Sequence, residues 1–150
     1  MTTKLTEAEL DAWQALLHAH AKVTDTLDAE LRRECGLTWS EYDVLVRLAR
    51  APGRSLRMAE LARRVMMSPS GLTRVADQLV AEGLVDRRRD ENDARVVFAG
   101  LTDKGRDRVR KAANVHLRGI REHFSGRLTK TQLRNVASAL QIIAGPHEPH

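Results

Sequence analysis

The sequence SLRMAELARRVMMSPSGLTRVADQLVAEGLVDRRRDENDARVVFAGL, residues 55–101, decides the fold of this chain. Apolar residues recur in it at intervals of three and four, which predicts a helix over residues 55–65, capped by Ser55, and a second helix over 68–83. The dipeptide Ser68-Pro69 opens the second helix, because a serine hydroxyl can cap the first amides and proline lacks only a donor that the first turn does not use.

Two short strands are predicted after these helices. Residues 84–88 and 96–101 have strand-like patterns, and the connector at 89–95 is charged and turn-prone. A short helix, a tight turn at Met66-Met67, a second helix and a two-stranded ribbon follow one another in this order. That order is typical of a winged helix-turn-helix, in which the second helix enters the major groove of DNA.

Long helical patterns flank this central part on both sides. The expected helices cover residues 6–34, 38–50, 102–124 and 129–143. Thr38, Thr102 and Thr129 can act as N-caps, and Thr38 and Thr129 are followed three residues later by Glu41 and Gln132, as in a capping box. The predicted fold is therefore mainly α, with six helices and a small β-ribbon.

The composition excludes several classes of protein. With 42% hydrophobic residues in 150, the chain can bury a core, whereas 3% aromatic residues are too few for a platform that stacks single-stranded bases. A single cysteine, Cys35, rules out an internal disulfide and a cysteine-based zinc finger. Without a run of 18 apolar residues or an apolar N-terminal signal, we expect a cytoplasmic protein with no membrane role.

Motifs that indicate catalysis or metal binding are missing from the sequence. It contains no glycine-rich phosphate loop, no His-Glu-x-x-His and no Gly-x-Ser-x-Gly, so an enzyme is not expected. Six histidines are present, but His116 and His123 would lie about 10 Å apart along a helix. Zinc needs three or four converging ligands, so neither a metal nor another cofactor is predicted.

Charge is distributed unevenly along the chain. Residues 1–37 hold four Lys or Arg against seven acidic residues, whereas 54–89 hold eight arginines against four acidic residues. A basic central segment suits a polyanion such as nucleic acid. A solvated face without a partner would have the same composition, so the charge alone does not decide between them.

The second helix of the motif has a polar outward face that fits duplex DNA. This face carries Ser70, Thr73, Arg74 and Gln78, with Ser68 at the start of the helix. Small hydroxyl residues allow the backbone to approach DNA closely, and Arg74 can reach a guanine edge or a phosphate. The helix N-terminus can itself bind a phosphate.

The ribbon adds a second set of candidate DNA contacts. Arg95 is predicted to enter a minor groove, with Asp93 holding its guanidinium in place. Arg87, Arg88 and Arg89 lie at the foot of the ribbon, where they would contact phosphates. Acidic residues at 86, 90 and 91 lie among them, so phosphate contacts are expected to be fewer than the arginines.

Residues 55–105 resemble the multiple-antibiotic-resistance regulator (MarR) family of winged-helix repressors. The resemblance rests on these groups: Leu61-Ala62, Ser68-Pro69-Ser70-Gly71-Leu72-Thr73-Arg74, Leu79, Glu82-Gly83-Leu84-Val85, Arg87-Arg88, Asp93-Ala94-Arg95 and Leu101-Thr102-Asp103-Lys104-Gly105. The last two groups are similar to the family's wing-tip Asp-x-Arg and to the Leu-Thr-x-x-Gly that follows it. The flanking long helices agree with the family pattern, so the resemblance covers nearly the whole chain.

The resemblance implies a homodimeric, ligand-responsive repressor that binds a pseudo-palindromic operator in double-stranded DNA. Its domains would be a dimerisation helix at 1–37, a DNA-binding winged helix at 38–101 and dimerisation helices at 102–150, intertwined in one fold. Apolar stripes on the end helices support a dimer independently, because an isolated helix cannot bury such a stripe. The interface candidates are Trp13, Leu17, Leu117, Ile120, Leu133, Leu140 and Ile143.

The family resemblance also implies a small effector, aromatic or lipophilic, that releases the DNA. Candidate walls of its pocket are Trp13, Leu17, Tyr42 and Leu45, although each of these would serve equally well as a plain core residue. Two alternative functions stay open at this stage. One is a winged-helix module that binds a protein, and the other is a redox-responsive regulator acting through Cys35.

Overall fold

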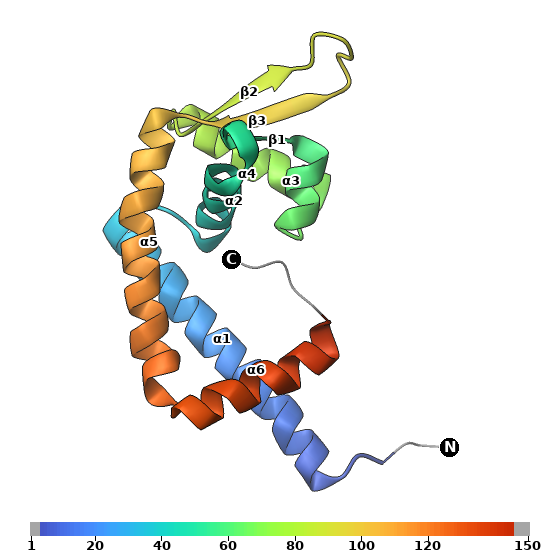
Figure 1. Cartoon of the computed structure of the whole chain (residues 1–150), viewed down its shortest axis with the longest axis vertical. Helices are drawn as coiled ribbons and strands as arrows, with labels where there is room; N and C mark the ends of the chain where they lie inside the picture. The colour runs from blue at the N-terminus through green and yellow to red at the C-terminus, as the bar shows by residue number, and fades with distance from the viewer. Residues whose placement is uncertain (1–3, 146–150) are drawn as a thin grey trace. The chain divides into compact units, whose positions relative to one another are not determined.

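The computed structural model describes residues 4–145, which form six α-helices and a three-stranded antiparallel sheet (Figure 1). The helices are α1 (Glu7–Cys35), α2 (Trp39–Arg50), α3 (Met58–Arg64), α4 (Pro69–Ala81), α5 (Asp103–His123) and α6 (Lys130–Ala144), and the strands are β1 (Ser55–Arg57), β2 (Val85–Arg89) and β3 (Val97–Leu101). The predicted six-helix winged fold is confirmed. No helix in this described part is long and apolar enough to cross a membrane.

The chain divides into two compact units. Residues 27–116 form the winged unit, which contains the sheet and helices α2, α3 and α4. The described residues before 27 and after 116 form the end unit, which contains α6. Helices α1 and α5 contribute residues to both units.

Local capping determines where most helices begin. Thr38 accepts a hydrogen bond from the amide of Glu41 (3.0 Å), and the Glu41 carboxylate accepts one from the amide of Thr38 (2.8 Å). The same reciprocal pair joins Thr129 and Gln132 ahead of α6. Ser68 caps α4 through the Gly71 amide at 3.1 Å. These caps confirm the boundaries that the sequence predicts.

The start of the third helix is a correction to the prediction. Residues 55–57 form strand β1 rather than the first turn of a helix, and α3 begins only at Met58. Ser55 is not an N-cap, since its hydroxyl donates to the carbonyl of Ala99 at 3.1 Å. Strand β1 pairs with β3 in the sheet order β1-β3-β2. Three residues are too few to show a periodicity, so only this long-range pairing identifies the strand.

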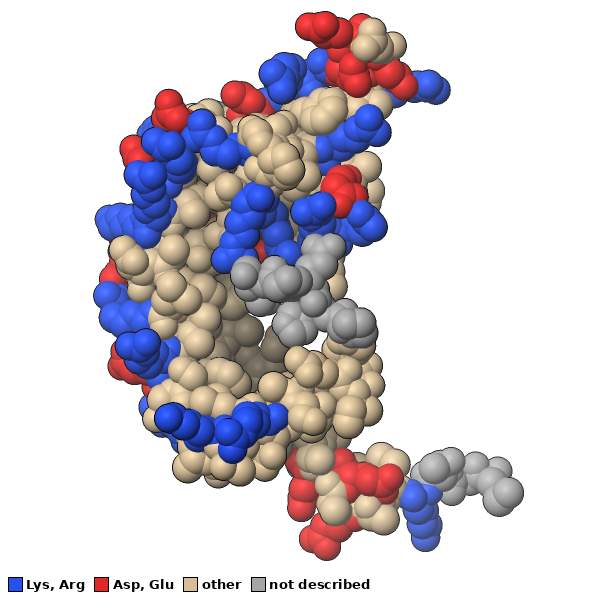
Figure 2. Space-filling model, in the orientation of Figure 1, with Lys and Arg blue, Asp and Glu red and all other residues tan. Residues whose placement is uncertain are grey.

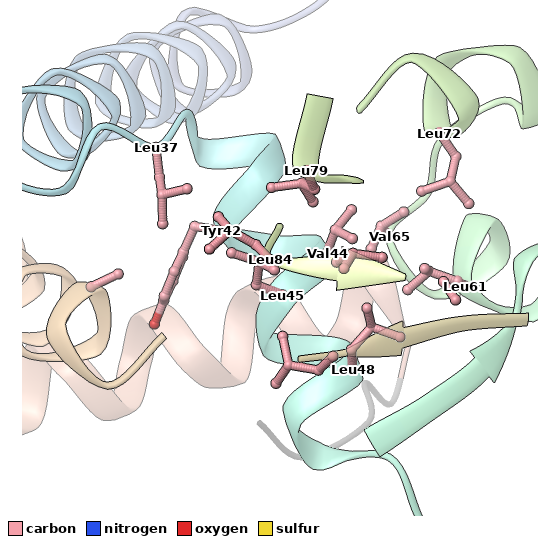
Figure 3. Close-up of a cluster of buried hydrophobic side chains, with 14 of the residues drawn as sticks. Leu37, Tyr42, Val44, Leu45, Leu48, Leu61, Val65, Leu72, Leu79 and Leu84 are labelled. Carbon is pink, nitrogen blue, oxygen red and sulfur yellow. The ribbon is translucent and has the colours of Figure 1, made fainter. Parts of the chain in front are cut away.

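Aliphatic side chains form the core of the winged unit, as the low aromatic content predicts. The largest fully buried side chains are Leu31, Leu37, Val44, Leu45, Leu48, Leu61, Leu72, Leu79 and Leu84, and Figure 3 shows most of them converging between the helices and the sheet. Leu72 and Leu79 come from α4, and Ala76 of the same helix is also buried. The buried stripe of α4 therefore determines which of its residues face solvent.

The turn between α3 and α4 contains an unusual backbone conformation. Met66 has φ +55°, a left-handed value that is normally adopted by glycine at this position after a helix. The next amide, that of Met67, donates to the Ala62 carbonyl at 3.0 Å and closes the turn. A non-glycine residue in the left-handed region costs roughly 1–2 kcal/mol. The turn is therefore less stable with methionine than it would be with glycine.

The first turn of α5 lies against the backbone just before β2, with no space for a side chain. A Cβ atom placed on Gly105 would lie 2.1 Å from the Leu84 carbonyl oxygen and 2.6 Å from Cδ1 of Leu101. The Thr102 hydroxyl donates to the Gly83 carbonyl (2.7 Å), and the Thr102 amide donates to the Leu84 carbonyl (3.1 Å). Glycine at 105 is therefore required for the close contact that connects the wing to α5.

We expect Gly105→Ala to destabilise the protein by about 1–3 kcal/mol, because the added methyl group overlaps a backbone carbonyl. In an open helix the same change would stabilise by about 1 kcal/mol, so the sign of the effect is informative. Urea unfolding followed by circular dichroism measures it. Asn114→Ala, at an exposed position of the same helix, is the control. A Gly105→Ala protein as stable as the wild type would contradict the close contact.

Candidate nucleic-acid interface

The outward face of α4 carries the predicted polar residues. Ser70, Thr73, Arg74 and Gln78 are all exposed, and Ser68 is exposed at the start of the helix. They are exposed because Leu72, Ala76 and Leu79 occupy the opposite face. The residues that the sequence predicts for the DNA-facing side of this helix therefore lie together on one exposed surface.

The hydroxyl groups on this face are already engaged within the helix. Ser68 Oγ accepts the Gly71 amide and lies 3.3 Å from Ser70 Oγ. Thr73 Oγ1 donates to the Pro69 carbonyl at 2.9 Å. A hydroxyl that donates its proton still has acceptor capacity, so Thr73 can accept from a base amine but has no proton left to donate.

Arg74 and Gln78 differ in how free their side chains are. Gln78 Nε2 donates to Glu82 Oε1 at 2.9 Å, so this amide is partly committed to the end of its own helix. The Arg74 guanidinium makes no hydrogen bond or ion pair with any residue that the structure describes. Its five N–H donors are therefore available to a ligand that approaches α4.

The three arginines at the foot of the wing have three different environments. Arg87 forms a close ion pair with Asp77, which connects β2 to α4. Arg89 donates to the Ala94 carbonyl at 3.4 Å, within the wing. Arg88 has no ionic or hydrogen-bonded partner within residues 4–145. Successive residues of a strand point to opposite faces, so Arg88 also projects away from the side that Arg87 and Arg89 share.

The tip of the wing contains the expected pair of Asp93 and Arg95. Asp93 Oδ1 accepts from the Arg95 amide (3.0 Å) and from its Nε (3.1 Å), and Oδ2 accepts from Nη2 (3.2 Å). The hydrogen bonds from the Arg95 side chain, followed by that from its amide, lower the pKa of the Asp93 carboxyl. The Arg95 side chain is 91% exposed although it is held at its base. The wing therefore presents an oriented guanidinium to solvent.

Arg57 is a basic residue of this surface that the sequence reasoning missed. A cleft of about 370 Å³ is lined by the arginines 57, 87 and 95 and by Thr73, with Met58, Ala59, Val96 and Val97 as its apolar part. The Arg57 guanidinium lies 5.8 Å from the centre of the Phe98 ring, on the neighbouring strand. Only the pairing of β1 with β3 places Arg57 here, so no local sequence pattern could have indicated it.

Charges of both signs cover the wing. Figure 2 shows basic side chains along the wing and a cluster of acidic ones at its tip. A second cavity, of about 260 Å³, is lined by Arg87, Arg88, Arg89 and Val97. The positive charge is therefore concentrated on the strands and the cleft, and the tip contributes mainly through Arg95.

The predicted effector residues fall into two different environments. Tyr42 and Leu45 are buried in the core of the winged unit, and burial raises the pKa of the Tyr42 hydroxyl. Trp13 and Leu17 are exposed side chains of α1 in the end unit. Neither cavity described above is lined by any of the four. The effector pocket stays a prediction.

Cys35 is a buried cysteine at the end of α1. Its carbonyl oxygen accepts a hydrogen bond from the Arg108 guanidinium at 3.1 Å. A redox sensor needs an exposed thiol of lowered pKa, and a buried side chain does not provide the exposure. The structure therefore favours a packing role for Cys35.

This fold and this surface define a winged helix-turn-helix protein. A model of the MarR family matches residues 36–96. Among solved structures, AbsC of Streptomyces coelicolor, a MarR family transcriptional regulator, is 35% identical with a TM-score of 0.89, over 95% of this chain and 96% of that one. Sco3205, a MarR family regulator of the same organism solved in complex with DNA, is 33% identical with a TM-score of 0.90, over 99% and 93%. The chain belongs to the MarR family.

Curated relatives match a shorter part of the chain. The transcriptional regulator AdcR of Streptococcus pneumoniae is 38% identical over 73 residues, which is 49% of this chain and 48% of AdcR. The first of these relatives are thus matched over about half of their length. All of these relatives are named as transcriptional regulators or repressors, in agreement with the expectation that this chain is not an enzyme.

We expect Arg95→Ala to raise the pKa of Asp93 towards the ordinary range of an aspartate, because it removes the hydrogen bonds that lower this pKa most. The Asp93–Arg95 ion pair is fully formed at neutral pH and is lost as the pH falls through the lowered pKa of Asp93. An NMR titration of the side-chain carboxyl carbon measures the shift. Arg88→Ala removes the same charge nearby and should leave Asp93 unchanged. Equal Asp93 pKa values in the wild type and Arg95→Ala would contradict the pair.

Proposed function

We propose that this protein is a sequence-specific regulator of transcription that binds duplex DNA as a homodimer. The observation that carries the proposal is the free Arg74 on the outward face of α4, together with an exposed, oriented Arg95 on the wing of the same unit. The DNA complex of the related Sco3205 supports a duplex as the ligand. Guanidiniums at two separate positions, on α4 and on the wing, suit simultaneous contacts with a major groove and a minor groove.

In this proposal α4 lies in the major groove, where Arg74 donates to guanine O6 and N7 or clamps a phosphate. Thr73 accepts from a base amine, and Ser68 and Ser70 allow close approach of the helix N-terminus. Arg95 enters the minor groove, which has a strong negative potential. Arg88 contacts a phosphate, and Arg87 does so while still paired to Asp77. Gln78, Arg89 and Asp93 act mainly by keeping these groups in position.

The homodimer is supported by apolar side chains that one chain leaves exposed. All but one of the exposed large apolar side chains belong to the end unit, and α6 has no buried residue at all. Those of the end unit are Leu5, Leu10, Trp13, Leu17, Leu117, Phe124, Leu140, Ile142 and Ile143. A second copy of the chain can cover this surface, with the half-buried Ile120 and Leu133 at its margin. A two-fold dimer would present two α4 helices to half-sites about one DNA turn apart.

The proposal further includes that the protein represses transcription and that a small effector releases it from DNA. Relatives named transcriptional repressors, MprA of Escherichia coli and Mb2911 of Mycobacterium bovis, support this direction of regulation. A MepR-like protein that is 29% identical was solved in complex with pseudoligands, which supports a small-molecule effector. Such a ligand releases DNA only if it binds the conformation that cannot bind DNA more tightly than the conformation that can.

Arg74→Ala and Arg95→Ala should each weaken binding to a duplex selected from a random-sequence pool by about 1–3 kcal/mol. Fluorescence anisotropy at several salt concentrations is the measurement. The log–log slope should be near −0.9 per phosphate contacted, so a variant that removes a phosphate contact loses about one unit of slope. Arg121→Ala, an exposed arginine of the end unit, removes the same charge and should change affinity little. A folded wild-type protein that selects no duplex would refute DNA binding and favour a protein partner.

Ile143→Glu should raise the dissociation constant of the dimer by about tenfold or more, because the interface would bury an unpaired charge. Ile143 is exposed in the single chain, so the fold of each chain should be preserved. Light scattering across a dilution series measures the effect, and Gln141→Glu adds the same charge to a neighbouring exposed position. An unchanged dissociation constant for Ile143→Glu would remove α6 from the interface.

A further inference from the structure

Met66 combines two features that no other residue of the winged unit shares. Its side chain is 90% exposed, and it is the large apolar side chain that residues 27–116 leave exposed. Its backbone is also left-handed, at φ +55°. Arg54 is the other non-glycine residue with a positive φ in the described part of the chain, but its guanidinium pairs with Asp103 at 3.2 Å. Met66 belongs neither to the core nor to the side chains packed against it, as far as residues 4–145 are concerned.

The neighbouring Met67 shows that the exposure is specific to position 66. Met67 is half-buried and packs against the core of the winged unit, so it anchors the turn. Met66 contributes nothing to that core. A glycine would close the same turn without backbone strain and without exposing an apolar chain to water. The left-handed backbone therefore lowers the stability of the free protein, and the exposed side chain adds nothing to it.

Position 66 is continuous with the proposed DNA surface. It precedes Ser68, the N-cap of α4, by two residues, and Ser68 and Ser70 begin the outward face of that helix. A duplex seated on the N-terminal part of α4 brings apolar carbon atoms close to this turn. These atoms are the deoxyribose carbons along the backbone and the 5-methyl groups of thymine in the major groove.

We propose that Met66 is a DNA-contacting residue whose side chain packs on apolar carbon atoms of the duplex beside the N-terminus of α4. This inference rests on the proposed function. Methionine suits the contact because its unbranched, polarisable chain adapts to an irregular apolar surface. Burial in the complex removes the exposure that the free protein carries, so the residue favours the bound state at the expense of the folded free state.

Three variants at this position separate the contact from the backbone. Met66→Ala removes the side chain and should weaken binding to the selected duplex about three- to tenfold, the order expected when one or two carbon groups lose their burial. Met66→Leu keeps an apolar chain and should bind within twofold of the wild type. Met66→Gly should bind as weakly as Met66→Ala but unfold about 2–4 °C higher, because its turn is unstrained.

A Met66→Gly protein that is more stable than the wild type but binds the duplex more weakly would identify a DNA contact. A residue with a purely structural role would not produce these opposite changes. Binding of Met66→Ala and Met66→Gly within twofold of the wild type would overturn the inference. The same result with tight wild-type binding would leave the proposed function intact. A wild type that selects no duplex at all would refute the proposed function, and the inference would fall with it.

Replacing thymine by deoxyuridine in the selected duplex then identifies the atoms contacted. If Met66 packs on a thymine methyl group, the replacement weakens the wild type and leaves Met66→Ala unaffected. If it packs on deoxyribose, the replacement affects both proteins equally, while Met66→Ala remains the weaker binder on both duplexes. Either pattern supports an apolar contact with the duplex.

Discussion

The burial of the apolar stripe of α4 is the constraint on which the DNA-facing surface depends. Leu72, Ala76 and Leu79 are in the core of the winged unit, and successive residues of a helix are turned by about 100°. Burying these three residues therefore fixes the rotation of α4 about its axis, and Arg74 and Gln78 have to point outward. The same core residues that stabilise the unit thus orient the side chains that would meet a duplex.

Some arginines of this unit are paired with acidic residues, so their positive charge is not fully available to DNA. Arg87 is neutralised by Asp77, and Arg95 is held by Asp93. These pairs connect the wing to α4 and set the direction of the guanidinium at its tip, at the expense of some attraction to phosphate. Exposed ion pairs contribute little to stability, so their value here is in positioning. The unneutralised positive charge of this surface then comes from the arginines that form no ion pair with a described residue, which are Arg57, Arg74, Arg88 and Arg89.

The features that the sequence predicted well are those encoded locally. The caps at Thr38, Ser68 and Thr129, the stripe of α4 and the Asp93–Arg95 pair each depend on residues close together in the sequence, so spacing alone identifies them. Strand β1 and Arg57 were missed because they depend on pairing with β3, more than 40 residues away. The left-handed backbone of Met66 was also missed, because methionine at that position does not signal a positive φ.

The two compact units leave unsatisfied surfaces of opposite chemistry. Residues 27–116 bury an aliphatic core of their own and expose polar donors and guanidiniums, with Met66 as the apolar exception. The end unit has the reverse pattern, since large apolar side chains such as Trp13, Leu140 and Ile143 are exposed. A polyanion can form hydrogen bonds and ion pairs with the first surface but has no apolar groups to bury the second. An apolar protein surface can bury the second but leaves the guanidiniums of the first without partners. One partner therefore cannot serve both surfaces, and this asymmetry favours a chain that binds DNA with one unit and a second copy of itself with the other.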